Sequence, residues 1–209
     1  MGDNDPGEGP AAPILVPELR DYHQINAEVV RRLDRGASFI RLEGPAGHRL
    51  LLAGLVGTWR AVVEVAGDVG PELAVGLDAP RLTIVCRGAS ADGAGSGLRG
   101  GTLLLLGPSG TAVGYGMSGG LIVAADRVGP RAGLGMTGGE LVLLRDVGPL
   151  AGERQAGGVL VLTGSHASRD VGRDARGGRR IVDAAGSGGL VGKAVRLIDG
   201  FSRSSVEEE

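Results

Sequence analysis

Short runs of aliphatic residues recur along the middle of this chain, and each run follows a glycine-rich turn. The runs are rich in Val, Ile and Leu and cover residues 103–106, 121–125, 141–144 and 159–162. Runs this short, bounded by glycine, predict β-strands rather than helices. A glycine inside a helix costs about 1 kcal/mol, and no repeat has a ten-residue stretch without one, which disfavours a helical repeat.

Two series of glycines fix the length of the repeat. Gly-Gly pairs begin at Gly100, Gly119, Gly138, Gly157 and Gly177, which gives spacings of 19, 19, 19 and 20 residues. Single glycines follow the same spacing at Gly95, Gly114, Gly133, Gly152 and Gly172. Constant spacing of this length predicts a solenoid, in which glycines make tight corners at positive φ and let one coil lie close on the next. We therefore predict an all-β fold, a right-handed parallel β-helix of six or seven coils and roughly 30 Å length.

The pattern divides the chain into four parts. Residues 1–13 are rich in Gly, Asp and Pro and are expected to form a disordered tail. Residues 14–43 should hold a helix and a cap, and residues 44–185 the β-helix, whose first coils are less regular. The period is lost after Ser187, so we expect residues 186–209 to be an irregular segment with an acidic tail.

One helix is predicted over residues 21–35. Asp21 can cap its N-terminus, Gln24 occupies the capping-box position, and Gly36 ends it. Its apolar stripe consists of Ile25, Val29 and Leu33. A strand is expected directly after it, over residues 39–42.

Composition narrows the classes of function. The net charge is −2 with acidic and basic residues interspersed, so no footprint for nucleic acid is expected. Residues 1–13 lack a signal sequence, and no apolar stretch is long enough to span a bilayer, so we expect a cytoplasmic protein without a membrane partner. The single Cys86 lies in a predicted strand and is expected to be a small buried hydrophobe.

Two turns match the G-x-G-x-x-G fingerprint of dinucleotide-binding loops, at residues 114–119 and 133–138. That chemistry requires a strand before the loop, a helix that opens at it, and an acidic residue about 20 positions later. Only the strand is present, and the match recurs at the repeat period. We therefore interpret both turns as corners of the coil.

The remaining reactive side chains form no recognised motif. The histidines, His23, His48 and His166, have no metal-ligand spacing, although His48 and His166 could meet if coils stack them. Serines such as Ser109, Ser118 and Ser165 lack a His-Asp pattern.

Aspartates recur about once per coil: Asp68, Asp92, Asp126, Asp146 and Asp170. Such a ladder could bind calcium, but the nonapeptide spacing of calcium-binding β-rolls is absent. We favour solvated corners whose carboxylates accept backbone N–H bonds. We thus predict no catalytic, cofactor-binding or metal-binding residue and no cofactor.

From about Gly44 to Arg180 the Gly-x-Gly-x-x-Gly-Gly turns and their aliphatic strands resemble the GXGXG domain at the C-terminus of the glutamate synthase large subunit. Standalone glutamate synthase-type subunits are similar, and so are the small GXGXG subunit of formylmethanofuran dehydrogenase and its formyltransferase/hydrolase relatives. Residues 25–29 and 40–47 resemble the segment that leads into the glutamate synthase domain, and Gly67-Asp68 falls at a family corner. The chain departs from the family at residues 47–51 and at Arg31.

The resemblance implies a non-catalytic scaffold in a glutamate synthase-like oxidoreductase or amidotransferase complex. The implied partners are a flavin or iron–sulfur oxidoreductase subunit and a glutaminase-like subunit. One alternative is a component of a one-carbon formyl-transfer complex. Another is a freestanding structural or ligand-binding solenoid; a nucleotide-binding enzyme would rest on the fingerprint matches alone.

Overall fold

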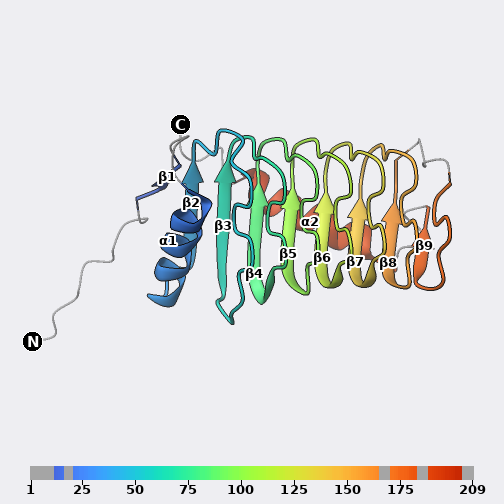
Figure 1. Cartoon of the computed structure of the whole chain (residues 1–209), viewed down its shortest axis with the longest axis horizontal. Coiled ribbons are helices and arrows are strands. Elements are labelled where there is room, and N and C mark those ends of the chain that lie inside the picture. The colour runs from blue at the N-terminus through green and yellow to red at the C-terminus, as the bar shows by residue number, and fades with distance from the viewer. Residues whose placement is uncertain (1–11, 17–20, 165–169, 183–187, 204–209) are drawn as a thin grey trace, which may run out of the picture.

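The chain folds into a parallel β-helix, as predicted (Figure 1). The computed structural model describes residues 12–16, 21–164, 170–182 and 188–203. Nine parallel strands form one sheet in which each strand pairs with the next along the chain. The strands are β1 (Ile14–Leu15), β2 (Phe39–Glu43), β3 (Ala61–Ala66), β4 (Asp78–Cys86), β5 (Gly100–Leu105), β6 (Ser118–Ala124), β7 (Thr137–Leu143), β8 (Gly157–Leu162) and β9 (Arg179–Ile181).

Side chains at equivalent positions of successive strands stack into ladders inside the coil. The register places one such row, the inner ladder, along the sheet from β2 to β9. Its members are Ile40, Val63, Ile84, Leu103, Ile122, Leu141, Leu160 and Arg180. The seven aliphatic members are buried in one continuous core. Arg180 ends the row and donates hydrogen bonds to Gln155 Oε1 at 3.1 Å and Gly177 O at 2.9 Å.

The two glycines of each pair have different roles. At Gly138 an added Cβ would lie 2.2 Å from Ser118 O in the preceding coil, so only glycine allows this stacking distance. Positive φ is found instead at the second glycine, with φ 78° at Gly139 and 71° at Gly120. The pairs were expected at the corners, but they lie at the start of the strands. Close approach to the preceding coil is found at both glycines, because an added Cβ at Gly139 would also lie 2.6 Å from Gly119 O.

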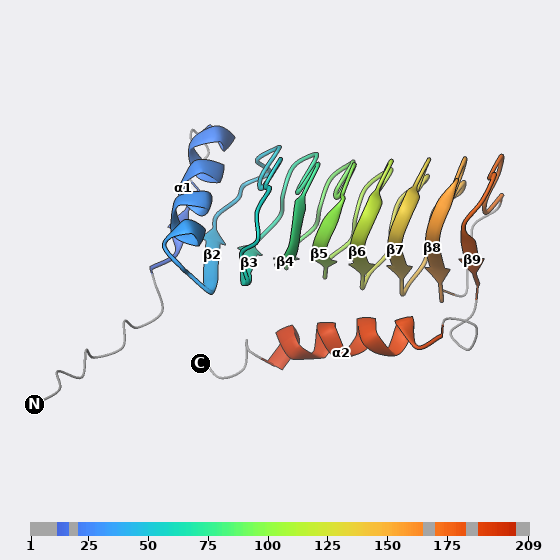
Figure 2. The same ribbon diagram turned by 90° about the horizontal axis from the view of Figure 1, so that it is seen from below.

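Helix α1 (Tyr22–Asp34) covers the N-terminal end of the solenoid (Figures 1 and 2). Asp21 caps it by accepting a hydrogen bond from His23 N at 3.2 Å, and the predicted apolar stripe is buried. The Asn26 amide bridges the helix to the first coil: it donates to Leu50 O at 3.0 Å and accepts from Leu52 N at 2.7 Å. Because both ends of the amide are used, α1 is attached to the coil by a pair of bonds like those of a β-ladder.

Helix α2 (Leu190–Arg203) replaces part of the irregular segment expected over 186–209, and that prediction is wrong. Figure 2 shows α2 running back along the outer side of the sheet, on the side opposite the coil corners. Its inward residues are spaced three or four apart, which is the helical period: Leu190, Val191, Ala194, Leu197, Ile198 and Phe201. Residues 1–11 and 204–209, which make up most of the two predicted tails, lie outside the described residues.

The outer face of the sheet carries a second row, the outer ladder, one residue out of step with the inner one. Its members are Arg41, Glu64, Val85, Leu104, Val123, Val142, Val161 and Ile181. The residues from Val85 to Val161 pack against α2 and form a second apolar cluster. The strands are therefore buried on both faces, which is why they read as uninterrupted aliphatic runs.

Candidate functional site

The two G-x-G-x-x-G turns are corners of the coil, as interpreted from the sequence. Each leads into a strand, β6 or β7, rather than a helix. Their N–H groups bond to adjacent coils: Gly116 N donates to Leu134 O at 2.8 Å and Gly135 N to Glu153 O at 2.7 Å. Because the ladder uses these donors, the turns cannot present them to a phosphate in the way a dinucleotide-binding loop does.

The corner aspartates hold the coils together, and the interpretation as backbone acceptors is confirmed for three of them. Asp68 Oδ1 accepts from Ala89 N and Asp92 Oδ1 from Thr111 N, both at 2.7 Å and both across one coil. Asp126 Oδ1 accepts from the adjacent Arg127 N at 2.7 Å. Among the described residues no group of three or more His, Cys, Asp or Glu side chains is placed to hold a metal ion.

The other reactive residues named from the sequence are dispersed. His23 is exposed on α1 beside the Tyr22 ring, with centroids 4.0 Å apart, and His48 lies in the irregular coil between β2 and β3. His166 and Ser165 lie outside the described residues, so the suggested meeting of His48 with His166 stays a prediction. Ser109 is buried outside the named strands, where it forms isolated bridges to adjacent coils and its hydroxyl bonds to that of Ser90 at 2.9 Å.

Cys86 is the small buried hydrophobe that the sequence predicted. It lies on β4 with no exposed surface, and its thiol donates to Gly88 O at 3.4 Å. Burial of the thiol in apolar surroundings raises its pKa to about 12. The thiolate needed for nucleophilic or redox chemistry is therefore strongly disfavoured.

A buried ion-pair network on the outer face was not predicted from the sequence. Glu64 on β3, with 3% of its side chain exposed, pairs with Arg41 Nη1 at 3.0 Å and Arg87 Nη2 at 2.6 Å. Arg87 also donates to Phe201 O at 3.1 Å, at the C-terminal end of α2. The only signal in the sequence was a single carboxylate within the aliphatic run of residues 61–66. The network marks the point where the apolar cover of the sheet ends.

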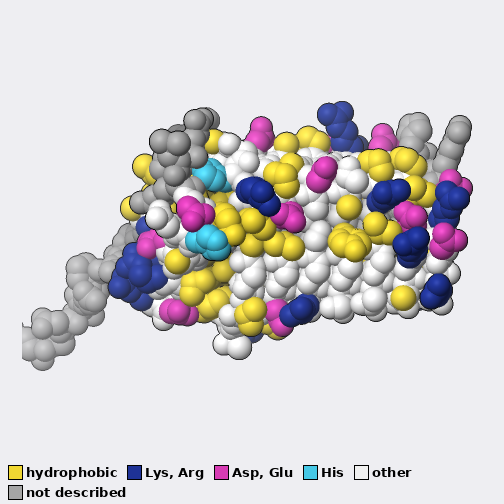
Figure 3. Space-filling view, in the orientation of Figure 1, with side chains coloured by type: hydrophobic (Ala, Val, Ile, Leu, Met, Phe, Trp, Pro, Cys, Tyr) yellow, Lys and Arg dark blue, Asp and Glu magenta, His cyan; other side chains and the backbone are white. Residues whose placement is uncertain are grey.

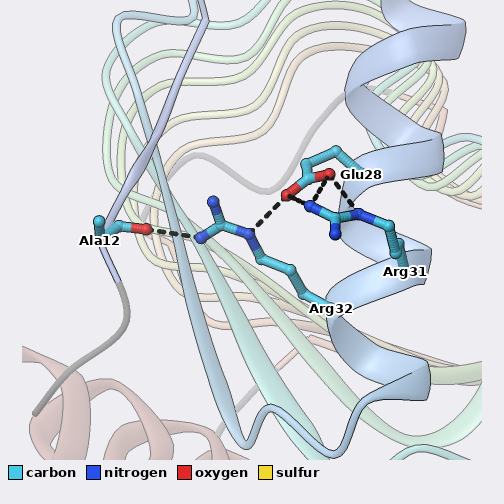
Figure 4. Close-up of polar contacts among 4 residues, drawn as sticks. All are labelled: Ala12, Glu28, Arg31 and Arg32. Atoms are coloured by element: carbon cyan, nitrogen blue, oxygen red, sulfur yellow. Dashed lines mark hydrogen bonds and ion pairs between the residues drawn. The ribbon is translucent and has the colours of Figure 1, made fainter. Parts of the chain in front are cut away.

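A second polar cluster joins α1 to the segment just before β1 (Figure 4). Glu28 pairs with Arg31 at 2.6 Å and Arg32 at 2.8 Å, and Arg32 extends to the carbonyl oxygen of Ala12. Hydrogen bonds from Arg31 and then Arg32 lower the pKa of the Glu28 carboxyl. The three side chains thus pair with one another and attach α1 to the chain just before β1.

Hollows are found at several places on the surface of the described chain, and two of them lie along the repeating coils. One, of about 330 Å³, lies along the flank of α2 and is lined mainly by apolar residues, among them Leu144, Val191 and Val195. The other, of about 780 Å³, lies over the corner at residues 91–97 and is bordered by the ring of Tyr115. We call it the Tyr115 groove.

Comparisons with models of known protein families, with curated proteins and with solved structures find no match to this chain. Neither helix that the structure describes has the length and apolar character needed to cross a lipid bilayer.

Proposed function

We propose that this protein is a non-catalytic scaffold subunit of a multi-subunit enzyme, and that its parent complex is of the glutamate synthase-like oxidoreductase or amidotransferase type. The observation that carries the scaffold role is a pair of hollows, the Tyr115 groove and the one beside α2, on a rod whose coils are hydrogen-bonded to one another. A rod of stacked coils presents its corners and flanks at fixed spacing, which suits it to hold other chains in place.

The reactive side chains support this proposal because they serve the fold itself. Cys86, the corner aspartates and the Glu64 network are all engaged within the chain. The flank of α2, by contrast, keeps apolar atoms in contact with solvent: Val195 is exposed, and Leu197 and Ile198 are only partly buried. Apolar flanks of this kind are typical of surfaces that another chain covers.

The choice of parent complex rests on the resemblance of the Gly-x-Gly-x-x-Gly-Gly corners to the GXGXG domain. Those corners are repeated in phase from Gly95 onward and set the stacking of the coils. The implied partners are a flavin or iron–sulfur oxidoreductase subunit and a glutaminase-like subunit.

Affinity purification of the tagged full-length chain from its own cells, followed by mass spectrometry and absorption spectroscopy, tests the proposal. We expect an assembly that contains a flavin or iron–sulfur subunit at a fixed ratio, while the chain purified alone is colourless. The matched control is the same chain with Val195→Glu, which adds a charge to the flank of α2 while leaving the inward side of the helix intact.

Three other results would each point elsewhere. Recovery of the chain alone under gentle lysis would favour a freestanding solenoid. Recovery with a molybdenum or tungsten formyl enzyme, or with a formyltransferase, would assign it to one-carbon metabolism. Catalytic turnover by the purified chain alone would overturn the scaffold role.

A further inference from the structure

The Tyr115 groove exists because one coil lacks large side chains at its corner. The backbone of Gly97 bonds to Tyr115 O at 2.7 Å, and that of Gly76 bonds to Ser96 O at 2.8 Å, so Ser96 and Tyr115 occupy equivalent positions in adjacent coils. Where neighbouring coils carry Val75 and Tyr115, this coil carries only Ser96. The flanking coils are about 10 Å apart, twice the strand spacing, which leaves room for one extended chain or long side chain between them.

Several polar groups at the floor of the groove are already engaged within the chain. Gly93 N bonds to Thr111 O at 2.8 Å, and the Ser96 hydroxyl donates to Gly93 O at 2.8 Å. A Cβ added at Gly97 would meet nothing closer than 3.9 Å, so there is open space above this residue. Recognition would then depend mainly on the side chains that border the groove.

Those side chains favour a cation at one end of the groove. Glu72 and Asp92 both border it, and their charges are only partly compensated. Within the part of the chain that the structure describes, Glu72 has one ion pair, an exposed one with Arg49 at 3.4 Å, and Asp92 uses one carboxylate oxygen to accept from Thr111 N. Tyr115 is 53% exposed, so one face of its ring can receive a guanidinium or ammonium group.

Arg99 borders the same groove next to β5 and has no hydrogen-bond or ion-pair partner for its side chain among the described residues. The groove is thus bordered by two carboxylates, an aromatic ring and a guanidinium group. On the face that Figure 3 shows, acidic, basic and hydrophobic side chains are interspersed.

We infer that the Tyr115 groove is the docking site for an extended segment of a partner subunit that carries an arginine. The arginine lies against the Tyr115 ring and is paired with Asp92 and Glu72, and a carbonyl or carboxylate oxygen of the same segment accepts from Arg99. This inference rests on the proposed function, because it assumes a protein partner.

A matched pair of probes tests the preference for a cation. Nα-acetyl-arginine amide and its uncharged isostere, Nα-acetyl-citrulline amide, are titrated into the ¹⁵N-labelled full-length chain, and amide shifts are followed by NMR. We expect saturable shifts at Gly93, Ser96 and Gly97 with the arginine probe, and binding about two- to fivefold weaker with citrulline. Equal binding of the two probes, or tighter binding of free arginine than of the capped amide, would overturn the inference.

Variants that keep the fold separate the contributions of ring and charge. Tyr115→Ala should weaken the arginine probe about two- to fivefold, while Tyr115→Phe keeps the ring and the binding. Asp92→Asn removes the charge but retains an oxygen to accept from Thr111 N. Asp126→Asn, a corner aspartate outside the groove, is its control. Unchanged binding in both Tyr115→Ala and Asp92→Asn would contradict the assigned site.

A substitution that fills the groove tests whether the partner subunit binds there, with the affinity purification described above as the assay. Ser96→Trp should abolish recovery of the partner subunit, whereas Arg173→Trp, at the equivalent position of the last described coil, should not. Recovery of the complex with Ser96→Trp would overturn the docking site and leave the scaffold role intact. If the wild-type chain brings down no partner, the proposed function fails, and the probe titration then decides the groove by itself.

Discussion

The two faces of the sheet are built from alternate residues of the same strands, yet they are buried by different means. On the inner face, each aliphatic side chain is covered by the coil that contains it and by the coils on either side. On the outer face, the apolar residues from Val85 to Val161 are covered by α2, which follows the last coil in the sequence. At β2 and β3 the same outer row changes to Arg41 and Glu64, close to where α2 ends.

This difference shows how a repeat protein can have a regular interior and an outer face that does not follow the repeat. The inner face follows from the period alone, because every coil must fill the same space. The outer face depends on a segment without the repeat, and its cover is incomplete at the flanks of α2. We therefore expect mutations on the two faces to differ in how much unfolding free energy they cost and in how far that cost depends on α2.

The largest loss of stability is expected on the inner face, in a comparison of two adjacent residues of β6. Ile122→Ala on the inner face should cost about 2–5 kcal/mol of unfolding free energy, and Val123→Ala on the outer face less, because it removes less buried volume and its cover can adjust. Urea denaturation measures both. In a chain with Ala194→Glu, which loosens α2, the cost of Val123→Ala should fall while that of Ile122→Ala remains. Equal dependence on Ala194→Glu would show that the faces are not independent.

The next effect tests the charged end of the outer face. Glu64→Ala should destabilise the protein by about 2 kcal/mol, below the 3–5 kcal/mol typical of breaking a fully buried pair, because Arg41 and Arg87 can reach solvent. Glu64→Leu continues the apolar row and should be close to neutral. Thermal and urea unfolding of the two variants measure this contrast. A loss with leucine as large as with alanine would mean that the ion pairs stabilise the fold directly.

The unfolding free energy should depend on pH through the Cys86 thiol, which lies on the inner face of the sheet. The pKa of Cys86 is raised from 9.0 to about 12, so the folded thiol keeps its proton where the unfolded chain has lost it. Its contribution to stability is complete below pH 9 and is lost as the pH rises toward 12, by about 1.4 kcal/mol per pH unit. Urea unfolding between pH 8 and 10 should show this decline in the wild type. Cys86→Ala should lack that part of the slope, and an identical slope in both chains would refute the assignment.

The smallest effect concerns the surface of α2. Lys193 pairs with Glu140 on β7 at 3.4 Å, with both side chains partly exposed. Lys193→Ala should change the unfolding free energy by no more than about 1 kcal/mol and Lys193→Arg by less. The difference should shrink further in 1 M salt. A salt-independent loss would indicate that Lys193 contributes through packing on the sheet.

The candidate surfaces were less accessible to sequence reasoning than the fold. The phase of the glycines predicted the strands, and the capping residues predicted α1 within a residue at each end. Helix α2 was missed because Gly192 and Gly200 interrupt an otherwise clear helical spacing of apolar residues. The Tyr115 groove could not be predicted, because a run of small residues reads as an ordinary corner until the adjacent coils are placed beside it.

The sequence by itself determined the coil: a fixed period of glycine and aliphatic residues leaves stacked parallel strands as the arrangement that buries every apolar run and pairs every strand. The tertiary structure decided what lies outside the coil. Segments many residues away decide whether Val123 faces water or a helix. They also decide whether the surface at Ser96 is raised or forms a groove. Periodicity describes the neighbours that a residue has within the repeat, whereas the outer surface is formed by neighbours that the repeat does not contain.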